Sequence, residues 1–163
     1  MKKVIIGIGI PGSGKTTLLK RFASKYEYSY ICPDDIRTEL TGNPSDQTKN
    51  KEVWEETHKR VLQIMKTKTV VVDATFASVD QRKSFLDLLR SNGAEKIEGI
   101  FVNTPLEIAK ERNANRDRFV PEHVLEKMSH FLSESVPNIN DGFDSLFTFD
   151  ENKMLKSLEV KKS

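Results

Sequence analysis

The fold of this chain is decided by one stretch, Gly9-Ile10-Pro11-Gly12-Ser13-Gly14-Lys15-Thr16, which matches the pattern G-x-x-x-x-G-K-[ST] in full. Its glycines let successive backbone N–H groups turn toward phosphate groups. Lys15 is placed to reach the β- and γ-phosphates of a nucleotide, and the Thr16 hydroxyl is placed to ligate Mg²⁺. The stretch therefore predicts a site for ATP and Mg²⁺. The predicted nucleotide-binding residues here are Gly9, Pro11, Gly12, Ser13, Gly14, Lys15, Thr16 and Thr17.

An ordinary glycine-rich turn is the alternative, and the flanking segments argue against it. Val4–Ile8 is a short β-branched run, typical of a buried parallel strand. The segment Lys15–Tyr26 then carries Leu18, Leu19 and Phe22 at helical spacing. A buried strand before the stretch and a helix after it are the context that a phosphate-binding loop requires.

Strands and helices are predicted to alternate along the rest of the chain. The further predicted strands are Tyr28–Cys32, Thr69–Asp73, Lys96–Val102 and Ser145–Phe149. The further predicted helices are Pro33–Leu40, Asn50–Lys66, one from a capping box at Ser78 to Ser91, one from a capping box at Thr104 into Arg112–Arg118, and Pro121–Ser133. This alternation predicts an α/β fold of the P-loop NTPase type, with a central parallel sheet of about five strands, flanking helices and a helical lid. We expect one kinase domain over residues 1–150 and a charged tail over 151–163, either a loose helix or disordered.

Composition places few limits on function. The 163 residues are 31% charged and 37% hydrophobic, as in an ordinary soluble domain. No apolar run approaches the roughly 20 residues that cross a bilayer, so no membrane association is expected. The single cysteine, Cys32, excludes an internal disulfide, and the cytoplasm is the expected location. A net charge of +2 permits an anionic partner without requiring one, and oligomeric state is not indicated.

Acidic side chains follow two of the predicted strands, where ligands bind in such sheets. Asp73 ends the apolar strand Thr69–Asp73, at the place where a P-loop enzyme holds Mg²⁺ or its water shell. The alternative is a strand-end aspartate that caps the next turn. Thr75, two residues on, is a candidate for phosphate contact or for a purely local role in the loop.

The pair Asp34 and Asp35, followed by Arg37, lies just after the second predicted strand. A kinase needs a carboxylate near the acceptor hydroxyl to orient it and take its proton. These residues therefore offer a general base and an anion clamp. Acids are equally expected in the first turn of any helix because of its dipole, and Arg37 could simply pair with Glu39 or with another neighbour.

An arginine-rich segment follows the fourth predicted strand. Arg112 and Arg116 are four residues apart and are expected on one helical face, with Arg118 in the loop beyond. Arginines on a mobile segment can neutralise the charge that develops on phosphate oxygens during transfer. The alternative is a solvated basic helix end.

Taken together, these residues resemble the kinase domain of phage-type polynucleotide 5′-hydroxyl kinases, within the zeta-toxin-like group of P-loop kinases. The resemblance runs from Met1 to about Phe131. It rests on Pro11–Thr16, Asp34-Asp35-x-Arg37, Asp73, Arg112-Asn113-x-x-Arg116, and Val120-Pro121-x-x-Val124-Leu125.

The resemblance implies a role for each matching residue. It implies Asp34 as general base, Arg37 as ligand of the acceptor phosphate, and Val120 and Val124 on either side of the acceptor base. Arg112 and Arg116 would bind the phosphates of ATP. Three departures lie on the acceptor side: Pro33 replaces an arginine, Thr75 replaces an asparagine, and the loop before Val120 is one residue shorter.

The predicted activity is therefore transfer of the ATP γ-phosphate to the 5′-hydroxyl of DNA or RNA, with repair as the implied setting. The predicted catalytic residues are Asp34, Lys15, Arg37 and Arg116, the acceptor-side residues are Asp34, Asp35, Arg37, Thr75, Val120 and Val124, and the metal ligands are Thr16 and Asp73. Two alternatives stay open. One is a kinase of the same fold that acts on a nucleoside, sugar or antibiotic, and the other is a nucleotide-dependent regulatory ATPase.

Overall fold

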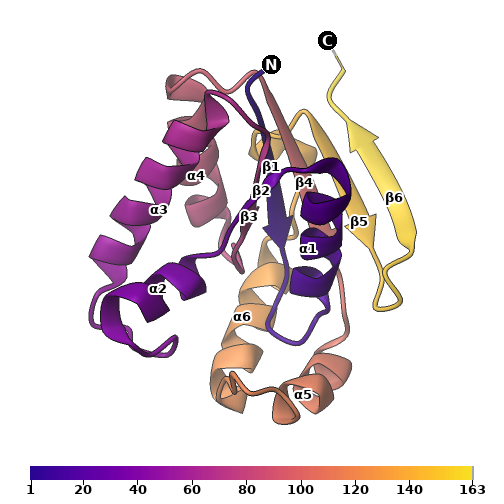
Figure 1. Cartoon of the computed structure of the whole chain (residues 1–163). Coiled ribbons are helices and arrows are strands. Elements are labelled where there is room, and N and C mark those ends of the chain that lie inside the picture. The colour runs from indigo at the N-terminus through magenta and orange to yellow at the C-terminus, as the bar shows by residue number, and fades with distance from the viewer. Residues whose placement is uncertain (163) are drawn as a thin grey trace.

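The apolar runs form a six-stranded sheet with the order β2-β3-β1-β4-β5-β6 (Figure 1). In this computed structural model, which describes residues 1–162, five strands are parallel and β6 pairs with β5 in the antiparallel direction. The strands are β1 (Lys3–Ile8), β2 (Ser29–Ile31), β3 (Val70–Asp73), β4 (Lys96–Val102), β5 (Ser145–Phe149) and β6 (Leu155–Val160). The predicted P-loop type of α/β fold is confirmed.

Helices cover both faces of the sheet (Figure 1). α1 (Lys15–Tyr26) covers one face, while α3 (Asn50–Met65) and α4 (Val79–Ser91) lie on the other. The remaining helices are α2 (Pro33–Thr41), α5 (Leu106–Ala114), α6 (Glu122–Glu134) and the short 3₁₀ helix η1 (Ile139–Asp141). α5 and α6 lie beyond the carboxyl ends of the strands, so the residues between strand and helix converge there. No helix within residues 1–162 is both long and apolar enough to span a membrane.

The core has two parts because successive strand residues point to opposite faces of the sheet. On β1, Val4, Ile6 and Ile8 pack into the larger cluster, with α3, α4 and α6, whereas Ile5 packs into the smaller cluster under α1. Every residue from Val70 to Asp73 is buried. This burial on both faces fixes β3, and it also fixes the position at which the carboxylate of Asp73 emerges.

The C-terminal segment differs from expectation. Residues from Glu151 were predicted as a loose helix or as disordered, but Leu155–Val160 forms β6 and raises the number of strands from about five to six. All six residues of β6 are exposed, and backbone pairing with β5 holds the strand in place. The prediction was wrong because an exposed edge strand carries no pattern of buried and exposed residues.

The two predicted capping boxes have different outcomes. Ser78 caps α4, and its hydroxyl oxygen accepts a hydrogen bond from the backbone N–H of Gln81 at 3.0 Å. Thr104 makes no cap, and α5 begins after Pro105. The Thr104 hydroxyl instead donates to the carbonyl oxygen of Ser13 at 2.9 Å. This bond ties the end of β4 to the glycine-rich loop.

Candidate active site

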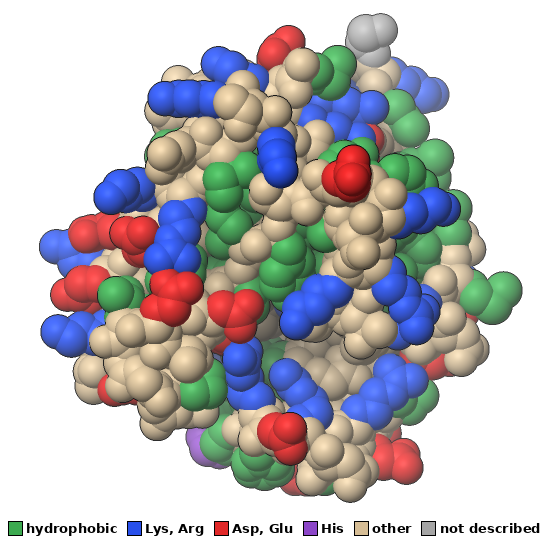
Figure 2. Space-filling view, in the orientation of Figure 1, with side chains coloured by type: hydrophobic (Ala, Val, Ile, Leu, Met, Phe, Trp, Pro, Cys, Tyr) green, Lys and Arg blue, Asp and Glu red, His purple; other side chains and the backbone are tan. Residues whose placement is uncertain are grey.

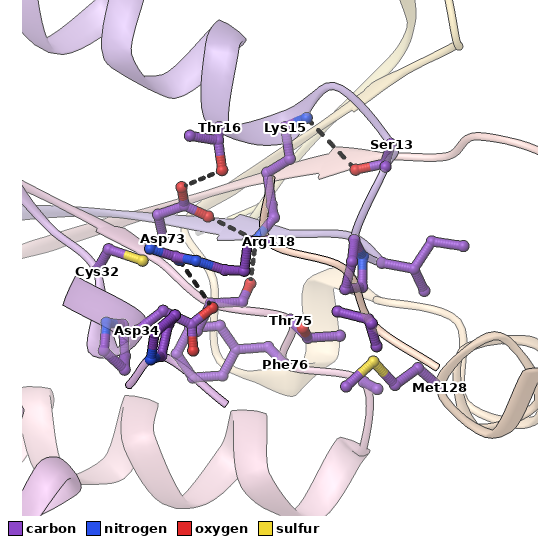
Figure 3. A pocket seen from close by; sticks show the side chains of 18 of the residues that line it. Ser13, Lys15, Thr16, Cys32, Asp34, Asp73, Thr75, Phe76, Arg118 and Met128 are labelled. Atoms are coloured by element: carbon purple, nitrogen blue, oxygen red, sulfur yellow. Dashed lines mark hydrogen bonds and ion pairs between the residues drawn. The ribbon is translucent and has the colours of Figure 1, made fainter. Parts of the chain in front are cut away.

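The glycine-rich loop joins β1 to α1 and brings Lys15 and Thr16 to the end of β3 (Figure 3). The Lys15 ammonium donates to Asp73 Oδ1 at 2.5 Å and to the Ala74 carbonyl oxygen at 2.9 Å. The Thr16 hydroxyl donates to Asp73 Oδ2 at 2.7 Å. The three predicted residues of the phosphate and metal site therefore meet at one point, although they lie nearly sixty positions apart in the chain.

Asp73 is held as a carboxylate. Its burial alone would raise its pKa, but the charge and hydrogen bond of Lys15, together with the hydroxyls of Tyr30 and Thr16, bring the pKa below its usual value. Tyr30 Oη donates to Asp73 Oδ2, and burial and the nearby Asp73 charge raise the pKa of the phenol.

Tyr30 was not among the residues predicted for the site. This residue lies on β2, beside Val71 of β3, and its proximity to Asp73 depends on β2 and β3 being neighbours in the sheet. The order of strands in a sheet is not written in the residues of either strand, so no local signal could have found Tyr30.

The donors at this point fit a magnesium ion. Asp73 and Thr16 present oxygen atoms, which Mg²⁺ prefers, and Mg²⁺ is usually bound by one or two carboxylates together with substrate phosphates. Within the described residues, 1–162, no group of three or more His, Cys, Asp or Glu side chains forms a metal cluster. A single carboxylate beside a phosphate loop therefore suits a metal that arrives with a nucleotide.

The loop packs directly against the start of the predicted lid. Gly12 and Gly14 have φ values of +84° and +90°, a backbone conformation that favours glycine. A Cβ atom at Gly12 would lie 2.4 Å from the backbone carbonyl oxygen of Ala109 in α5. Gly12 is therefore required both by its own backbone and by the closeness of α5.

Asp34, the predicted base, lies in the first turn of α2 and contacts two arginines. Its Oδ1 accepts a hydrogen bond from Arg37 Nη1 at 2.5 Å, and its Oδ2 lies 3.3 Å from Arg118 Nη1. Asp35 contacts the same arginine, with Oδ1 3.5 Å from Arg118 Nη2.

Arg37 is 94% buried, since only 6% of its surface is exposed. Besides Asp34 it donates to the Asn50 side chain at 3.0 Å, and its Nε has no hydrogen-bond partner among residues 1–162. Of the alternative partners, Glu39 is wrong, because it binds Arg60 at 2.6 Å, whereas pairing with a neighbour is found, since that neighbour is Asp34.

The lid segment, which we define as residues 112–120, contains the predicted arginines. Arg112 lies in the last turn of α5, but the helix ends at Ala114, so Arg116 lies in the turn beyond it. The prediction that both share one helical face is therefore wrong. Arg116 Nη1 is buried and has no hydrogen-bond partner in the part of the chain that the structure describes.

A reciprocal pair of bonds closes the lid segment. The Asn113 side chain accepts from the Val120 N–H at 3.1 Å and donates to the Val120 carbonyl oxygen at 2.6 Å. Asn113 is 1% exposed. Asn113 was expected only as part of a motif, and these bonds explain how the short loop that carries Arg116 and Arg118 keeps a defined path.

One cavity of about 1160 Å³ unites these parts. Figure 2 shows it as a hollow whose rim carries many Lys and Arg side chains. The predicted site residues that line it are Pro11, Gly12, Ser13, Gly14, Lys15, Thr16, Thr17, Asp34, Asp35, Arg37, Asp73, Thr75, Arg112, Arg116, Val120 and Val124. Gly9 does not line the cavity, and its N–H donates to the Thr75 carbonyl oxygen at 3.3 Å. Lys20, Tyr30 and Arg118 also line the cavity and were not among the predicted site residues.

A family model described as an AAA domain, AAA_33, matches residues 4–134, which include the phosphate loop, Asp34, Asp73 and the lid segment. The chain belongs to the AAA_33 family. The fold of this AAA_33 domain is of the P-loop kinase type.

Two relatives share part of the sequence. The chain is 28% identical over 140 residues to an Acanthamoeba polyphaga mimivirus protein assigned as a bifunctional polynucleotide phosphatase/kinase, covering 86% of this chain and 27% of that protein. It is also 28% identical over 128 residues to the cytidylate kinase of Methanocaldococcus jannaschii, covering 74% and 67%. The chain thus spans about a quarter of the length of the mimivirus protein.

Solved structures share the fold at lower identity. A chain of the Pnkp1/Rnl/Hen1 RNA repair complex superposes with a TM-score of 0.73 at 21% identity, over 82% of this chain and 44% of that one. A gluconokinase from Sinorhizobium meliloti gives 0.63 at 19% identity, over 94% and 85%. The toxin-antitoxin system PezAT of Streptococcus pneumoniae gives 0.63 at 15% identity, over 97% and 72%. These likenesses establish the fold.

Proposed function

We propose that this AAA_33 domain transfers the γ-phosphate of ATP to the 5′-hydroxyl of a DNA or RNA strand. One observation carries the proposal. The carboxylate of Asp34 and the buried guanidinium of Arg37 are joined at 2.5 Å inside the cavity that also holds Lys15, Thr16 and Asp73. A carboxylate that can accept the proton of a hydroxyl and a guanidinium that can bind a phosphate therefore lie together in the cavity of the phosphate-binding loop.

On the donor side, the loop N–H groups and Lys15 bind the β- and γ-phosphates. Thr16 and Asp73 hold Mg²⁺, which when bound neutralises charge on the phosphate oxygens. Lys15 then exchanges part of its contact with Asp73 for the nucleotide. Arg112 and Arg116 approach the phosphates from the lid segment, and the unpartnered Nη1 of Arg116 supplies a donor for them.

On the acceptor side, Asp34 takes the proton of the 5′-hydroxyl as its oxygen forms a bond to the γ-phosphorus. The bond from that phosphorus to the β,γ-bridging oxygen breaks, and ADP leaves with the electron pair. Arg37 binds the acceptor's neighbouring phosphate through its free Nε. Val120 and Val124 offer apolar surface to the acceptor base, and Asp35 and Thr75 line the same cavity.

A nucleic-acid acceptor is supported by the name of the mimivirus relative and by the fold shared with a chain of an RNA repair complex. The Lys and Arg side chains around the hollow give a phosphate backbone a favourable approach. End repair in the cytoplasm is the setting that we propose for this reaction.

A small-molecule kinase is the second candidate, because the cytidylate kinase of Methanocaldococcus jannaschii is as identical to this chain as the mimivirus protein is. A net charge of only +2 also suits a small acceptor. A regulatory ATPase is less well supported, since it has no use for Asp34 beside Arg37.

The deciding experiment is transfer of labelled γ-phosphate from ATP·Mg²⁺ to a short 5′-hydroxyl oligonucleotide, DNA and RNA in parallel. Nucleosides, cytidylate and gluconate are tested in the same series. We expect label on the 5′ end of the oligonucleotide. Label on a small acceptor, with none on the oligonucleotide, would refute the proposed acceptor and leave the donor site intact.

A further inference from the structure

Asp34 is not free in this structure, because each of its carboxylate oxygens faces an arginine. Oδ1 is bound by Arg37, and Oδ2 faces Arg118, which comes from the lid segment on the other side of the cavity (Figure 3). Each carboxylate oxygen can accept more than one hydrogen bond, so the hydroxyl of an acceptor would compete with Arg118 for Oδ2.

The two contacts differ in strength. Arg37 Nη1 lies 2.5 Å from Oδ1, and Arg37 is almost fully buried. Arg118 Nη1 lies 3.3 Å from Oδ2, its Nη2 lies 3.5 Å from Asp35, and 32% of the Arg118 side chain is exposed. Long, partly hydrated ion pairs are weak, so Arg118 is the contact that can be exchanged at low cost.

The backbone around Arg118 does not have to move for such an exchange. Asn113 binds both backbone groups of Val120 and closes the lid segment two residues after Arg118. Arg118 makes no hydrogen bond to any described residue other than Asp34 and Asp35. A change of side-chain rotamer alone can therefore move its guanidinium from the carboxylates into the cavity that it lines.

We propose that Arg118 is an acceptor-recognition residue that pairs with Asp34 and Asp35 when the acceptor site is empty and with a phosphate of the acceptor strand when it is filled. This inference rests on the proposed function. The phosphodianion or phosphodiester of a nucleic acid replaces the two carboxylates as the partner of the guanidinium. Oδ2 of Asp34 is then released for the hydroxyl only after the acceptor has arrived.

The pairing has a second effect, on water. A kinase whose base is free without an acceptor can hydrolyse ATP: a water oxygen bonds to the γ-phosphorus, the bridging bond breaks, and the water proton passes to Asp34. With Arg118 on Oδ2, a water molecule has to compete with the guanidinium for that oxygen. Arg118 therefore suppresses hydrolysis in the absence of the acceptor.

The test compares Arg118→Ala and Arg118→Lys with the wild type and with Arg60→Ala. Arg60 is a matched control, because it also binds two carboxylates, Glu39 and Glu56, but lies outside the cavity. Each protein is measured for the KM of a 5′-hydroxyl oligonucleotide, the KM of ATP, and the rate of ATP hydrolysis without an acceptor. A thermal melt of each variant confirms that it is folded.

For Arg118→Ala we expect the KM of the oligonucleotide to rise about tenfold, as for loss of one charge-assisted hydrogen bond, with the KM of ATP unchanged. Acceptor-free hydrolysis should rise at least threefold. Arg118→Lys should recover most of the wild-type KM for the oligonucleotide and most of the wild-type restraint on hydrolysis. Arg60→Ala should match the wild type. Hydrolysis that stays at or below the wild-type rate in Arg118→Ala would overturn the proposal. If the wild type labels no oligonucleotide, the proposed function fails, and the hydrolysis comparison still decides whether Arg118 restrains Asp34.

Discussion

Two buried ion pairs in this domain have opposite surroundings. Lys15 and Asp73 meet at 2.5 Å in the cavity, and Arg82 and Asp141 meet at 2.9 Å between α4 and η1. Arg82 is 1% exposed, and each of its three nitrogens donates: Nε to Asp141, Nη1 to the carbonyl oxygens of Phe76 and Ala77, and Nη2 to that of Ser135. Nothing in the Arg82 pair is left for a ligand.

The cavity is different, because Arg37 Nε and Arg116 Nη1 are buried there without a partner among residues 1–162. Buried polar groups are nearly always hydrogen-bonded, so two such donors around one cavity need an explanation. A phosphate-bearing ligand supplies it. The comparison teaches that a buried charge alone does not mark a binding site, whereas buried donors left over beside it do.

The largest effect should come from the base. Asp34→Asn keeps the shape of the side chain but removes the charge that accepts a proton, so we expect γ-phosphate transfer to fall about 10²- to 10⁴-fold. ATP binding, measured by calorimetry, should stay at the wild-type level, because Asp34 lies on the acceptor side. Glu39→Gln, on the same helix but paired outside with Arg60, is the control. Transfer within threefold of wild type in Asp34→Asn would remove Asp34 from this role.

The pair of Arg82 and Asp141, in which every nitrogen of Arg82 already donates, should affect stability and not phosphate transfer. Arg82→Ala leaves Asp141 and three carbonyl oxygens without their partner, so we expect the free energy of unfolding to fall by about 3–5 kcal/mol. Urea denaturation measures the loss. Arg90→Ala, which breaks the half-exposed pair with Asp144, should cost about 1 kcal/mol. Equal losses for the two variants would show that the fully bonded Arg82 contributes no more to stability than the more exposed Arg90.

Arg116, whose Nη1 has no partner among the described residues, should affect phosphate transfer and not stability. Arg116→Ala removes a donor that binds no described residue, so stability should change by less than about 0.5 kcal/mol. Transfer should nevertheless fall about 10²-fold, the cost of losing one donor to a developing phosphate charge. A large loss of stability with little loss of transfer would show that Arg116 belongs with Arg82 instead.

The smallest effect should come from the partly exposed ion pair of Arg90 and Asp144, and it concerns stability. Burial acts to raise the pKa of Asp144. The hydrogen bond from the Ile97 N–H and the charge and hydrogen bond of Arg90 together lower it by more, so the pKa in the folded protein is below the usual value. A depressed pKa stabilises the fold above the unfolded value of about 3.9, and this contribution is lost as the pH falls through the folded value.

Asp144→Asn should therefore cost about 1 kcal/mol at pH 7, and the difference from the wild type should shrink as the pH is lowered from about 5 toward 2. Urea denaturation of both proteins across this range measures it. A difference that is the same at every pH would show that the carboxylate charge is not responsible.

Much of this architecture could be predicted from the sequence. Apolar β-branched runs such as Val70–Val72 identify buried strands, and the end of such a strand places Asp73 at the edge where ligands bind. The glycine pattern fixed the loop, and Asp34, Arg37 and Arg116 meet in the same cavity as expected. These features depend on local residue types, which the sequence states directly.

Other features depend on which elements become neighbours. Leu155 and Leu158 are three apart, a helical spacing, but backbone pairing with β5 makes this segment a strand with an irregular register at Thr148/Phe149. Tyr30 reaches Asp73 only because β2 lies beside β3. Arg118 reaches Asp34 across 84 positions, and only the folded lid segment brings them together.

The close approach of Gly12 to Ala109 limits which residues mutation can place at position 12. A Cβ atom at position 12 would lie 2.4 Å from the Ala109 carbonyl oxygen, closer than non-bonded atoms approach, so α5 would have to shift. That helix carries Arg112 and leads into Arg116. A substitution of Gly12 in the phosphate loop would therefore also displace Arg112 and Arg116 of the lid segment. In a population of variants, position 12 should remain glycine even where the nucleotide itself would accept alanine.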